Sequence, residues 1–373
     1  MHKQKILIVS NGFYPEISPR SFRATELAKE FARQGHEVKV ISHDRGDVKQ
    51  FSTRHGFSFQ DMGPMSWPKP VVSGTGLKRL VSRVVVRLTT LLLEYPNIQL
   101  LFLVRKALAS QSGFDLLISV AVPYPIHWGV AWFRSSKHPV AATWVADCGD
   151  PYMGQENDTF QAPFYFGWVE KWFCRKADYL SVPTQGSIGG YYPEFRHKIR
   201  VIPQGFRFED YQMADFKPSE KVIFGYGGMF IPGKRDPKEL IEFLLSIEER
   251  YQFEFHIYTS TPQWVLPYTA NSKSILIHQV VGRTELMHEF SKMDFVVNFT
   301  NIGTSQTPSK LIDYAILGKP ILNVVTGQLR PADVLSFLDR DFSNSYVVAD
   351  REQYRIENVA QLFLNLIDET GER

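Results

Sequence analysis

The chain repeats one pattern: a short apolar run, a polar loop, and then a segment with apolar residues at helical spacing. The apolar runs occupy residues 5–9, 38–42, 115–119, 139–146, 178–182 and 199–202, and later 221–225, 253–258, 275–281, 295–299 and 321–325. Continuous apolar runs that alternate with helices are typical of parallel strands covered on both faces. The pattern predicts the α/β class with two doubly wound sheets in tandem.

The first helix shows clear local signals. Apolar side chains recur at helical spacing over residues 24–31, Ser18 can cap the start, Pro19 suits the first position and Gly35 ends the pattern. Residues 56–76, rich in Gly and Pro, are expected to be irregular. We expect an N-terminal domain over 1–203, a linker over 204–220, a second domain over 221–350 and a C-terminal helix over 351–373 that packs across the domains.

Composition narrows the functional classes. Of 373 residues, 44% are hydrophobic and 22% are charged, which excludes a disordered chain. The net charge of +3 gives no reason to expect a nucleic-acid partner. Cys148 and Cys174 are the only cysteines, too few for a disulfide scaffold and without metal-type spacing, so no metal site is expected. An apolar run begins at Ile6 with no signal-peptide pattern before it, so a cytoplasmic location is expected.

The loop before residue 310 suggests an anion site. Thr307 can cap a helix, Pro308 can begin it and Gly318 can end it, so its first N–H groups would face a phosphate. Lys310 and Asp313 share one helix face, where they could meet a diphosphate and ribose hydroxyls. For Lys310 and Asp313 taken alone, a surface ion pair on a well-capped helix is the simpler explanation.

A glycine-rich loop follows the run at 221–225. Asp236, Pro237 and Glu239 predict a capping box, which would hold Lys234 and Arg235 just before a helix, as suits a phosphate. A lone glycine-rich loop is often only a tight turn. Because the chain lacks the GxGxxG and Walker patterns, a dinucleotide dehydrogenase or P-loop NTPase is disfavoured.

Polar residues also follow the strands of the N-terminal half. These candidates are Tyr14, Glu16, Arg20, Arg23, His127, Asp147 and Asp150. Ligands in open α/β sheets bind beyond the carboxyl ends of strands, although each of these residues could be a solvated loop residue or a core histidine. No Ser or Cys lies in a nucleophile-elbow pattern, so a covalent hydrolase is not indicated.

Residues 77–93 form a basic amphipathic pattern. Arg79, Arg83 and Arg87 recur every four residues beside a broad apolar surface. The arginines interrupt it too often for a membrane span, so a helix lying at the inner face of a membrane is predicted. The alternative is a core helix whose arginines border an acceptor cleft. The aromatic-rich residues 160–173 could add a second membrane contact.

Several motifs stand in one order along the chain. They are Tyr14-Pro-Glu16, Gly35-His-Glu-Val-Lys-Val40, Ala177-Asp-Tyr-Leu-Ser-Val-Pro-Thr184, Ile202-Pro-Gln-Gly205, the stretch from Gly228 to Pro237, Pro308-Ser-Lys310, Asp313-Tyr314 and Gly318-Lys-Pro320. Together they resemble the retaining glycosyltransferases of family 4 over essentially the whole chain. The resemblance implies a GT-B fold, in which two Rossmann-like domains enclose a cleft.

The resemblance also implies residue roles. Catalytic candidates are Arg235 and Lys310, with His127 as a third that lies beyond the usual histidine position because Val120–Val122 occupy that stretch. The donor would be bound by Gly228, Met229, Lys234, Val281, Ser305, Thr307, Ser309 and Asp313. The acceptor would be bound by Tyr14, Glu16, Arg20, Arg23, Asp147 and Asp150.

One position departs from the family pattern. The usual pair of glutamates eight positions apart falls on Ser305 and Asp313, so donor-sugar contacts are expected to be atypical. The resemblance implies metal-independent, retaining transfer from a nucleotide-diphosphate sugar, without a cofactor, to a glycan or lipid-linked acceptor in cell-surface polysaccharide synthesis. The alternatives are a non-catalytic sugar-nucleotide-binding subunit and a GT-B sugar-nucleotide epimerase.

Overall fold

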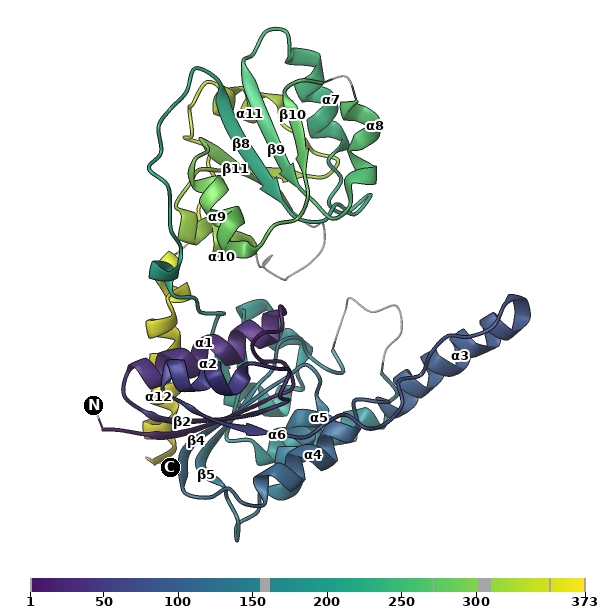
Figure 1. The fold of residues 1–373 in the computed structure, drawn as a ribbon, viewed down its shortest axis with the longest axis vertical. Coiled ribbons are helices and arrows are strands. Elements are labelled where there is room, and N and C mark those ends of the chain that lie inside the picture. Colours follow the sequence, from purple (N-terminus) through teal and green to yellow (C-terminus); the bar gives the residue numbers. More distant parts are fainter. Residues whose placement is uncertain (1, 155–161, 271, 301–309, 349, 372–373) are drawn as a thin grey trace. The chain divides into compact units, whose positions relative to one another are not determined.

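The computed structural model describes residues 2–154, 162–270, 272–300, 310–348 and 350–371. The chain divides into two compact units. Unit 1 comprises Met1–Phe206 and Gln353–Arg373, and unit 2 comprises Arg207–Glu352. Each unit contains one parallel sheet with helices on both faces (Figure 1).

The sheet of unit 1 has seven strands in the order β3-β2-β1-β4-β5-β6-β7. The strands are β1 (Lys5–Ser10), β2 (Glu37–Ser42), β3 (Ser58–Asp61), β4 (Phe114–Val120), β5 (Ala141–Asp147), β6 (Tyr179–Val182) and β7 (Ile199–Val201). The helices are α1 (Pro19–Arg33), α2 (Val48–His55), α3 (Gly76–Leu93), α4 (Gln99–Leu108), α5 (Pro125–Phe133), α6 (Phe166–Lys176) and α12 (Ile356–Gly371). The order reverses between β1 and β4, which is where open α/β sheets bind ligands.

Alternate residues of β1 belong to different cores, as the two-residue period of a strand requires. Ile6 and Ile8 pack in a core with α1, α2 and α12. Leu7 and Val9 pack in a second core with α4, α5 and α6. Both faces of the sheet are therefore buried, which explains the uninterrupted apolar run.

Unit 2 repeats this architecture with five strands in the order β10-β9-β8-β11-β12. The strands are β8 (Val222–Gly227), β9 (Phe253–Tyr258), β10 (Ile275–His278), β11 (Phe295–Thr300) and β12 (Ile321–Val325). The helices are α7 (Lys238–Ile247), α8 (Leu266–Thr269), α9 (Arg283–Ser291), α10 (Lys310–Leu317) and α11 (Pro331–Leu338). Helices α7 and α11 contribute to one core of the unit, and α9 and α10 contribute to the other.

Several sequence predictions are confirmed. The α1 helix begins at Pro19, the Ser18 side chain accepts a hydrogen bond from the Ser21 amide, and Gly35 follows the helix with a positive φ of 87°. The two doubly wound sheets are present as expected. The stretch expected to be irregular contains the short strand β3, which pairs with β2 at the edge of the sheet.

The C-terminal helix α12 belongs to unit 1, where it contacts α1, β4 and β5. The expectation that it packs across both domains stays a prediction. Ile356, Val359, Phe363 and Leu366 enter the core beneath α1. The chain thus returns to complete the first unit, because the face of the sheet beside α1 needs a second long apolar helix.

Helix α3 projects from the rest of unit 1 (Figure 1). None of its residues is buried, so the alternative of a core helix is wrong. Across the described residues, no helix combines the length and apolar character needed to span a bilayer.

Candidate functional site

The carboxyl edge of the first sheet holds a buried ion pair. Arg23 on α1 donates to Asp147 at the end of β5, from Nε to Oδ2 at 3.2 Å and from Nη2 to Oδ1 at 2.8 Å. Arg23 also donates to the carbonyl groups of Ile202 and Pro203, and Ser181 Oγ donates to Asp147 Oδ1 at 2.7 Å. Burial alone would raise the pKa of Asp147, but Arg23 and then Arg20 lower it below its usual value. Asp147 therefore stays ionised and firmly placed.

Arg20 is the more exposed member of this group. Its Nη1 lies 3.6 Å from Asp147 Oδ2, and its side chain is 23% exposed against 3% for Arg23. A Cβ at Gly149 would lie 2.4 Å from Arg20 Nη2, so the guanidinium group can lie here only because residue 149 is a glycine. The group of Arg20, Arg23 and Asp147 therefore carries one net positive charge.

The other acceptor candidates are more dispersed. The Tyr14 ring stacks on Phe51 with centroids 3.9 Å apart. Glu16 pairs with Arg45, and the Asp150 carbonyl accepts a hydrogen bond from Tyr124 Oη. The structure therefore brings Arg20, Arg23 and Asp147 together, and gives Tyr14, Glu16 and Asp150 local partners.

His127 lies in the core of unit 1 and is wholly buried. Its Nδ1 is 2.8 Å from Ser119 Oγ and its Nε2 is 3.5 Å from Cys148 Sγ, while Trp144 Nε1 donates to Ser119 Oγ at 2.8 Å. Burial lowers the pKa of His127 to about 3, so the ring is neutral at ordinary pH. This placement supports a core role, and the geometry gives no support to His127 as a catalytic residue.

The glycine-rich loop of unit 2 begins where β8 ends. Gly228 has a φ of 145°, which other residues rarely adopt, and its amide donates to the Tyr258 carbonyl at 2.8 Å. Met229 and Lys234 are exposed, and Arg235 is half-buried. Burial raises the pKa of the Tyr226 hydroxyl to about 12, although the neighbouring Arg235 guanidinium opposes this rise. Arg235 thus lies beside the end of β8, where it was predicted.

The predicted capping box forms only in part. Asp236 Oδ1 accepts a hydrogen bond from the amide of Lys238, the first residue of α7, at 3.1 Å, although Pro237 and not Asp236 occupies the N-cap position. The Asp236 amide, however, donates to Thr326 Oγ1 at 3.2 Å, and Glu239 accepts from the Leu329 amide at 3.4 Å. The reciprocal contact of a capping box is therefore replaced by bonds to the segment after β12.

Asp313 on α10 is held by an arginine. Arg283 Nε donates to Asp313 Oδ1 at 2.7 Å, and Arg283 Nη2 contacts the same oxygen. Val281 is half-buried and packs against the core cluster to which Leu311 and Tyr314 of α10 belong. The helix ends as predicted, because Gly318 has a φ of 65° and its amide donates to the Tyr314 carbonyl.

Some donor candidates lie at or beyond the limits of the described residues. Lys310 is the first described residue of α10, and its side chain lies outside the description. Ser305, Thr307 and Ser309 lie outside the described residues. The described residues contain no group of three His, Cys, Asp or Glu side chains arranged to hold a metal ion.

Sequence reasoning missed Arg283. Its only signal was its position just after an apolar run, in the sequence Val280-Val-Gly-Arg283. That position puts the first residue of α9 at the carboxyl edge of the sheet, where α10 also begins. The contact with Asp313 depends on how α9 and α10 pack together, which the residue pattern does not specify.

Comparisons with known proteins agree with this architecture. Residues 21–205 match the family model described as a glycosyl transferase 4-like domain. No curated protein sequence matches the chain significantly.

Solved structures resemble the whole chain. A glycosyltransferase from Rickettsia africae ESF-5 is 13% identical and covers 100% of both chains, with a TM-score of 0.62. Anabaena HepE in complex with UDP-glucose is 12% identical over 99% of this chain and 98% of that chain, with a TM-score of 0.54. UDP-GlcNAc 2-epimerase from Methanocaldococcus jannaschii is 12% identical over 98% and 99% of the two chains, with a TM-score of 0.56.

At these identities the likeness shows the fold, which is GT-B: two Rossmann-like α/β domains in tandem. The family match and the solved glycosyltransferases together support a GT-B glycosyltransferase. The epimerase shares the fold, so the fold alone does not separate these activities.

Proposed function

We propose that this protein is a retaining glycosyltransferase that moves a sugar from a nucleotide-diphosphate donor to an acceptor hydroxyl. The observation that carries the proposal is the set of side chains at the carboxyl edge of the second sheet. There a glycine-rich loop with Arg235 follows β8, and the start of α10 brings Asp313 beside Arg283. Glycines that admit a close backbone approach and a guanidinium group suit a diphosphate, and a carboxylate suits ribose hydroxyls. HepE, which shares the fold, was solved with UDP-glucose.

Each donor candidate then has a role. Arg235 and Lys310 pair with the diphosphate, together with the amides near Thr307, and Asp313 accepts hydrogen bonds from the ribose. The rest of the donor site is formed by Gly228, Met229, Lys234, Val281, Ser305 and Ser309. The acceptor lies over unit 1, where Arg20, Arg23 and Asp147 are the candidates that contact one another.

The proposed reaction needs no protein nucleophile. The bond between the anomeric carbon and the diphosphate breaks while the acceptor oxygen forms a bond on the same face of the sugar. The acceptor proton passes to the leaving diphosphate. Cationic side chains stabilise the negative charge that develops on this group, which is the main contribution of the protein and removes the need for a metal ion or cofactor.

The decisive experiment has two stages. Thermal-shift measurements with UDP, ADP, GDP and their common sugar derivatives identify the base, since a bound nucleotide raises the midpoint by mass action. Transfer to glycan acceptors is then followed by NMR, which reports the anomeric configuration of the product. A product of inverted configuration would overturn the retaining mechanism, and binding without transfer would favour a non-catalytic subunit.

The epimerase alternative has a separate signature. It predicts interconversion of two sugar nucleotides with no acceptor present. The M. jannaschii neighbour makes this a reasonable second candidate, because its fold is the same. Incubation of the sugar nucleotide alone, followed by chromatography of the sugar, distinguishes epimerisation from transfer.

The proposal extends to a lipid-linked acceptor at the inner face of a membrane, consistent with cell-surface polysaccharide synthesis and a cytoplasmic location. Helix α3 carries Lys78 and three arginines and contains no acidic residue. Its apolar side chains are exposed, including Leu77 at 76% and Leu80 at 57%. A basic amphipathic helix with this exposure suits the surface of an anionic bilayer.

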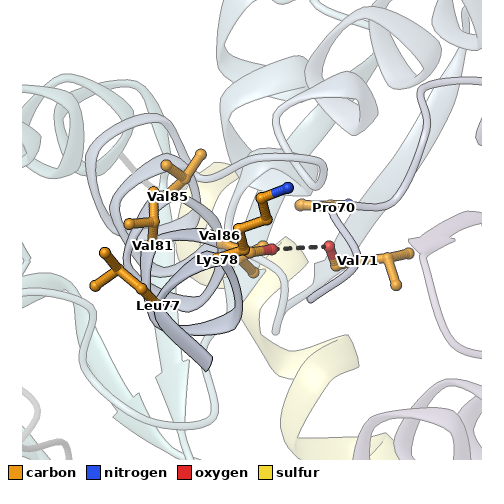
Figure 2. A pocket seen from close by; sticks show the side chains of 8 residues that line it. Pro70, Val71, Leu77, Lys78, Val81, Val85 and Val86 are labelled. Atoms are coloured by element: carbon orange, nitrogen blue, oxygen red, sulfur yellow. Dashed lines mark hydrogen bonds between the residues drawn. The ribbon is translucent and has the colours of Figure 1, made fainter. Parts of the chain in front are cut away.

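A shallow groove beside α3 supports the same proposal. It has a cavity volume of about 510 Å³ and lies between the helix and the preceding segment (Figure 2). Pro70 and Val71 line one side and Leu77, Val81 and Val85 belong to the helix, while Ser82 Oγ bonds the Val71 carbonyl at 3.4 Å. In unit 1, Phe164 and Trp168 are also exposed, at 75% and 69%.

Flotation with anionic liposomes at low and high salt tests this extension. A variant with Arg79→Glu, Arg83→Glu and Arg87→Glu should lose binding, because each cation near anionic lipid contributes about 1 kcal/mol. A variant with Lys3→Glu, Lys49→Glu and Lys137→Glu changes the net charge equally at exposed sites outside α3 and should still bind. Equally weak flotation of the wild type and both variants would remove the reason for a lipid-linked acceptor.

A further inference from the structure

The ion pair between Arg283 and Asp313 joins two helices at the carboxyl edge of the second sheet. Arg283 is the first residue of α9, and Asp313 lies in the first turn of α10. Two guanidinium nitrogens approach the same carboxylate oxygen, Oδ1. The two side chains are 20% and 23% exposed, so the pair faces solvent only in part and is screened less than a surface pair.

Arg283 is itself held from a second direction. Its guanidinium carbon lies 5.4 Å from the centre of the Tyr211 ring, a distance suited to a cation–π contact. The segment after Tyr211 is fastened to α9, because the Gln212 carbonyl lies 2.9 Å from His288 Nδ1 and the Ala214 amide donates to Ser291 Oγ at 2.8 Å. The arginine is therefore fixed before any ligand arrives, and it fixes the aspartate in turn.

A carboxylate can accept about four hydrogen bonds, so an arginine at Oδ1 does not exhaust the capacity of Asp313. An aspartate side chain has few rotatable bonds, and one fixed oxygen determines where the whole carboxylate points. A side chain that is already held in its binding orientation loses less conformational entropy when the ligand binds, so the affinity is higher.

We infer that Arg283 is a positioning residue that holds Asp313 in the orientation needed to recognise the ribose hydroxyls of the donor nucleotide. This inference rests on the proposed function, since it assigns the specificity of the same site. Arg283 acts through Asp313 and determines whether the protein prefers a ribonucleotide to an analogue that lacks these hydroxyls.

The test measures ribose preference by calorimetric titration. The probes are UDP, ADP and GDP and their 2′,3′-dideoxy forms. The wild type should prefer the ribose form of its nucleotide by about tenfold or more. The dideoxy form has no hydroxyl groups to donate hydrogen bonds to the Asp313 carboxylate. Arg283→Ala should lower this preference to about threefold or less and leave the affinity for the dideoxy form unchanged.

Three further variants sharpen the test. Arg283→Lys should restore part of the preference, because a cation returns without the fork of the guanidinium group. Asp313→Asn should lose it, and adding Arg283→Ala to Asp313→Asn should cause little further loss if both act as one unit. Lys238→Ala, which removes an exposed ion pair on α7, should keep the wild-type preference.

The outcomes separate the inference from the proposed function. If Arg283→Ala keeps the wild-type preference, or loses affinity for the ribose and dideoxy forms equally, the positioning role is overturned. If the wild type binds a nucleotide without any ribose preference, the inference fails while a nucleotide site remains. If the wild type binds no nucleotide, the proposed function fails and the inference fails with it.

Discussion

Arg23 and Asp147 form a buried bidentate ion pair across 124 positions of sequence. Their side chains are 3% and 2% exposed. The pair links α1 to the end of β5, and Arg23 also donates to the carbonyl groups of Ile202 and Pro203, which follow β7. It therefore fixes the geometry of the edge where Arg20 is partly exposed.

Asp147→Ala should lower the free energy of unfolding by about 3–5 kcal/mol, because it leaves the Arg23 charge buried without its partner. The contribution should also disappear as pH falls, since the pKa of Asp147 is held below 3.8 in the folded state. Urea unfolding monitored by circular dichroism measures this. Glu194→Ala, which removes the half-exposed pair with Lys171, should cost about 1 kcal/mol or less. Equal midpoints for the two variants would contradict the argument.

Arg235→Ala and Lys310→Ala should each lower kcat/KM by about 10²-fold or more. Each would remove a cation that stabilises the leaving diphosphate, and such groups act mainly in the transition state. Initial rates of transfer measure the effect once a donor is known, with Lys238→Ala as the control. Near-normal rates for both single variants would reject the proposed diphosphate site.

Glu170 on α6 should make stability depend on pH. The residue is wholly buried, and burial raises its pKa from 4.5 to about 7 against the weaker opposing influence of the Met153 and Tyr152 amides. An acid with a raised pKa takes up a proton on folding, so its contribution falls as pH rises from about 4.5 to 7. The free energy of unfolding should therefore fall by about 3 kcal/mol, since each pKa unit corresponds to about 1.4 kcal/mol.

Comparison of the wild type with Glu170→Gln isolates this effect. The difference in unfolding free energy between the two proteins should change by about 3 kcal/mol in favour of the variant from pH 4 to pH 8. Other titrating groups cancel in this difference. Parallel stability curves for the two proteins would show that Glu170 keeps an ordinary pKa.

Transfer activity should survive EDTA. The proposed mechanism assigns the stabilisation of the leaving group to Arg235 and Lys310, so a chelator removes nothing that the reaction uses. Rates measured with and without EDTA should agree within the error of the assay. Loss of activity that Mg²⁺ or Mn²⁺ restores would contradict metal independence.

Local signals in the sequence predicted much of the fold. Both ends of α1 could be predicted, because Ser18, Pro19 and Gly35 act on adjacent backbone groups. Strand β3 was missed because its sequence, Ser58-Phe-Gln-Asp61, is short and polar, and an edge strand needs no continuous apolar run.

The candidate sites could be located only to an edge of each sheet. The rule that ligands bind beyond the carboxyl ends of strands brought attention to Arg20, Arg23, Arg235 and Asp313. The same rule also selected His127 as a candidate, although the His127 side chain points into the core, toward Ser119 and Cys148. A residue pattern near a strand end does not state which way a side chain points.

The sequence by itself determined the alternation of strands and helices, the two tandem sheets and the loops that end beside them, because hydrophobic period and capping act within a few residues. Tertiary structure alone decided that Arg23 meets Asp147, that Arg283 meets Asp313, that α12 completes unit 1 and that α3 stays uncovered. These outcomes depend on packing between segments far apart in the chain, where each contact competes with many others of similar free energy.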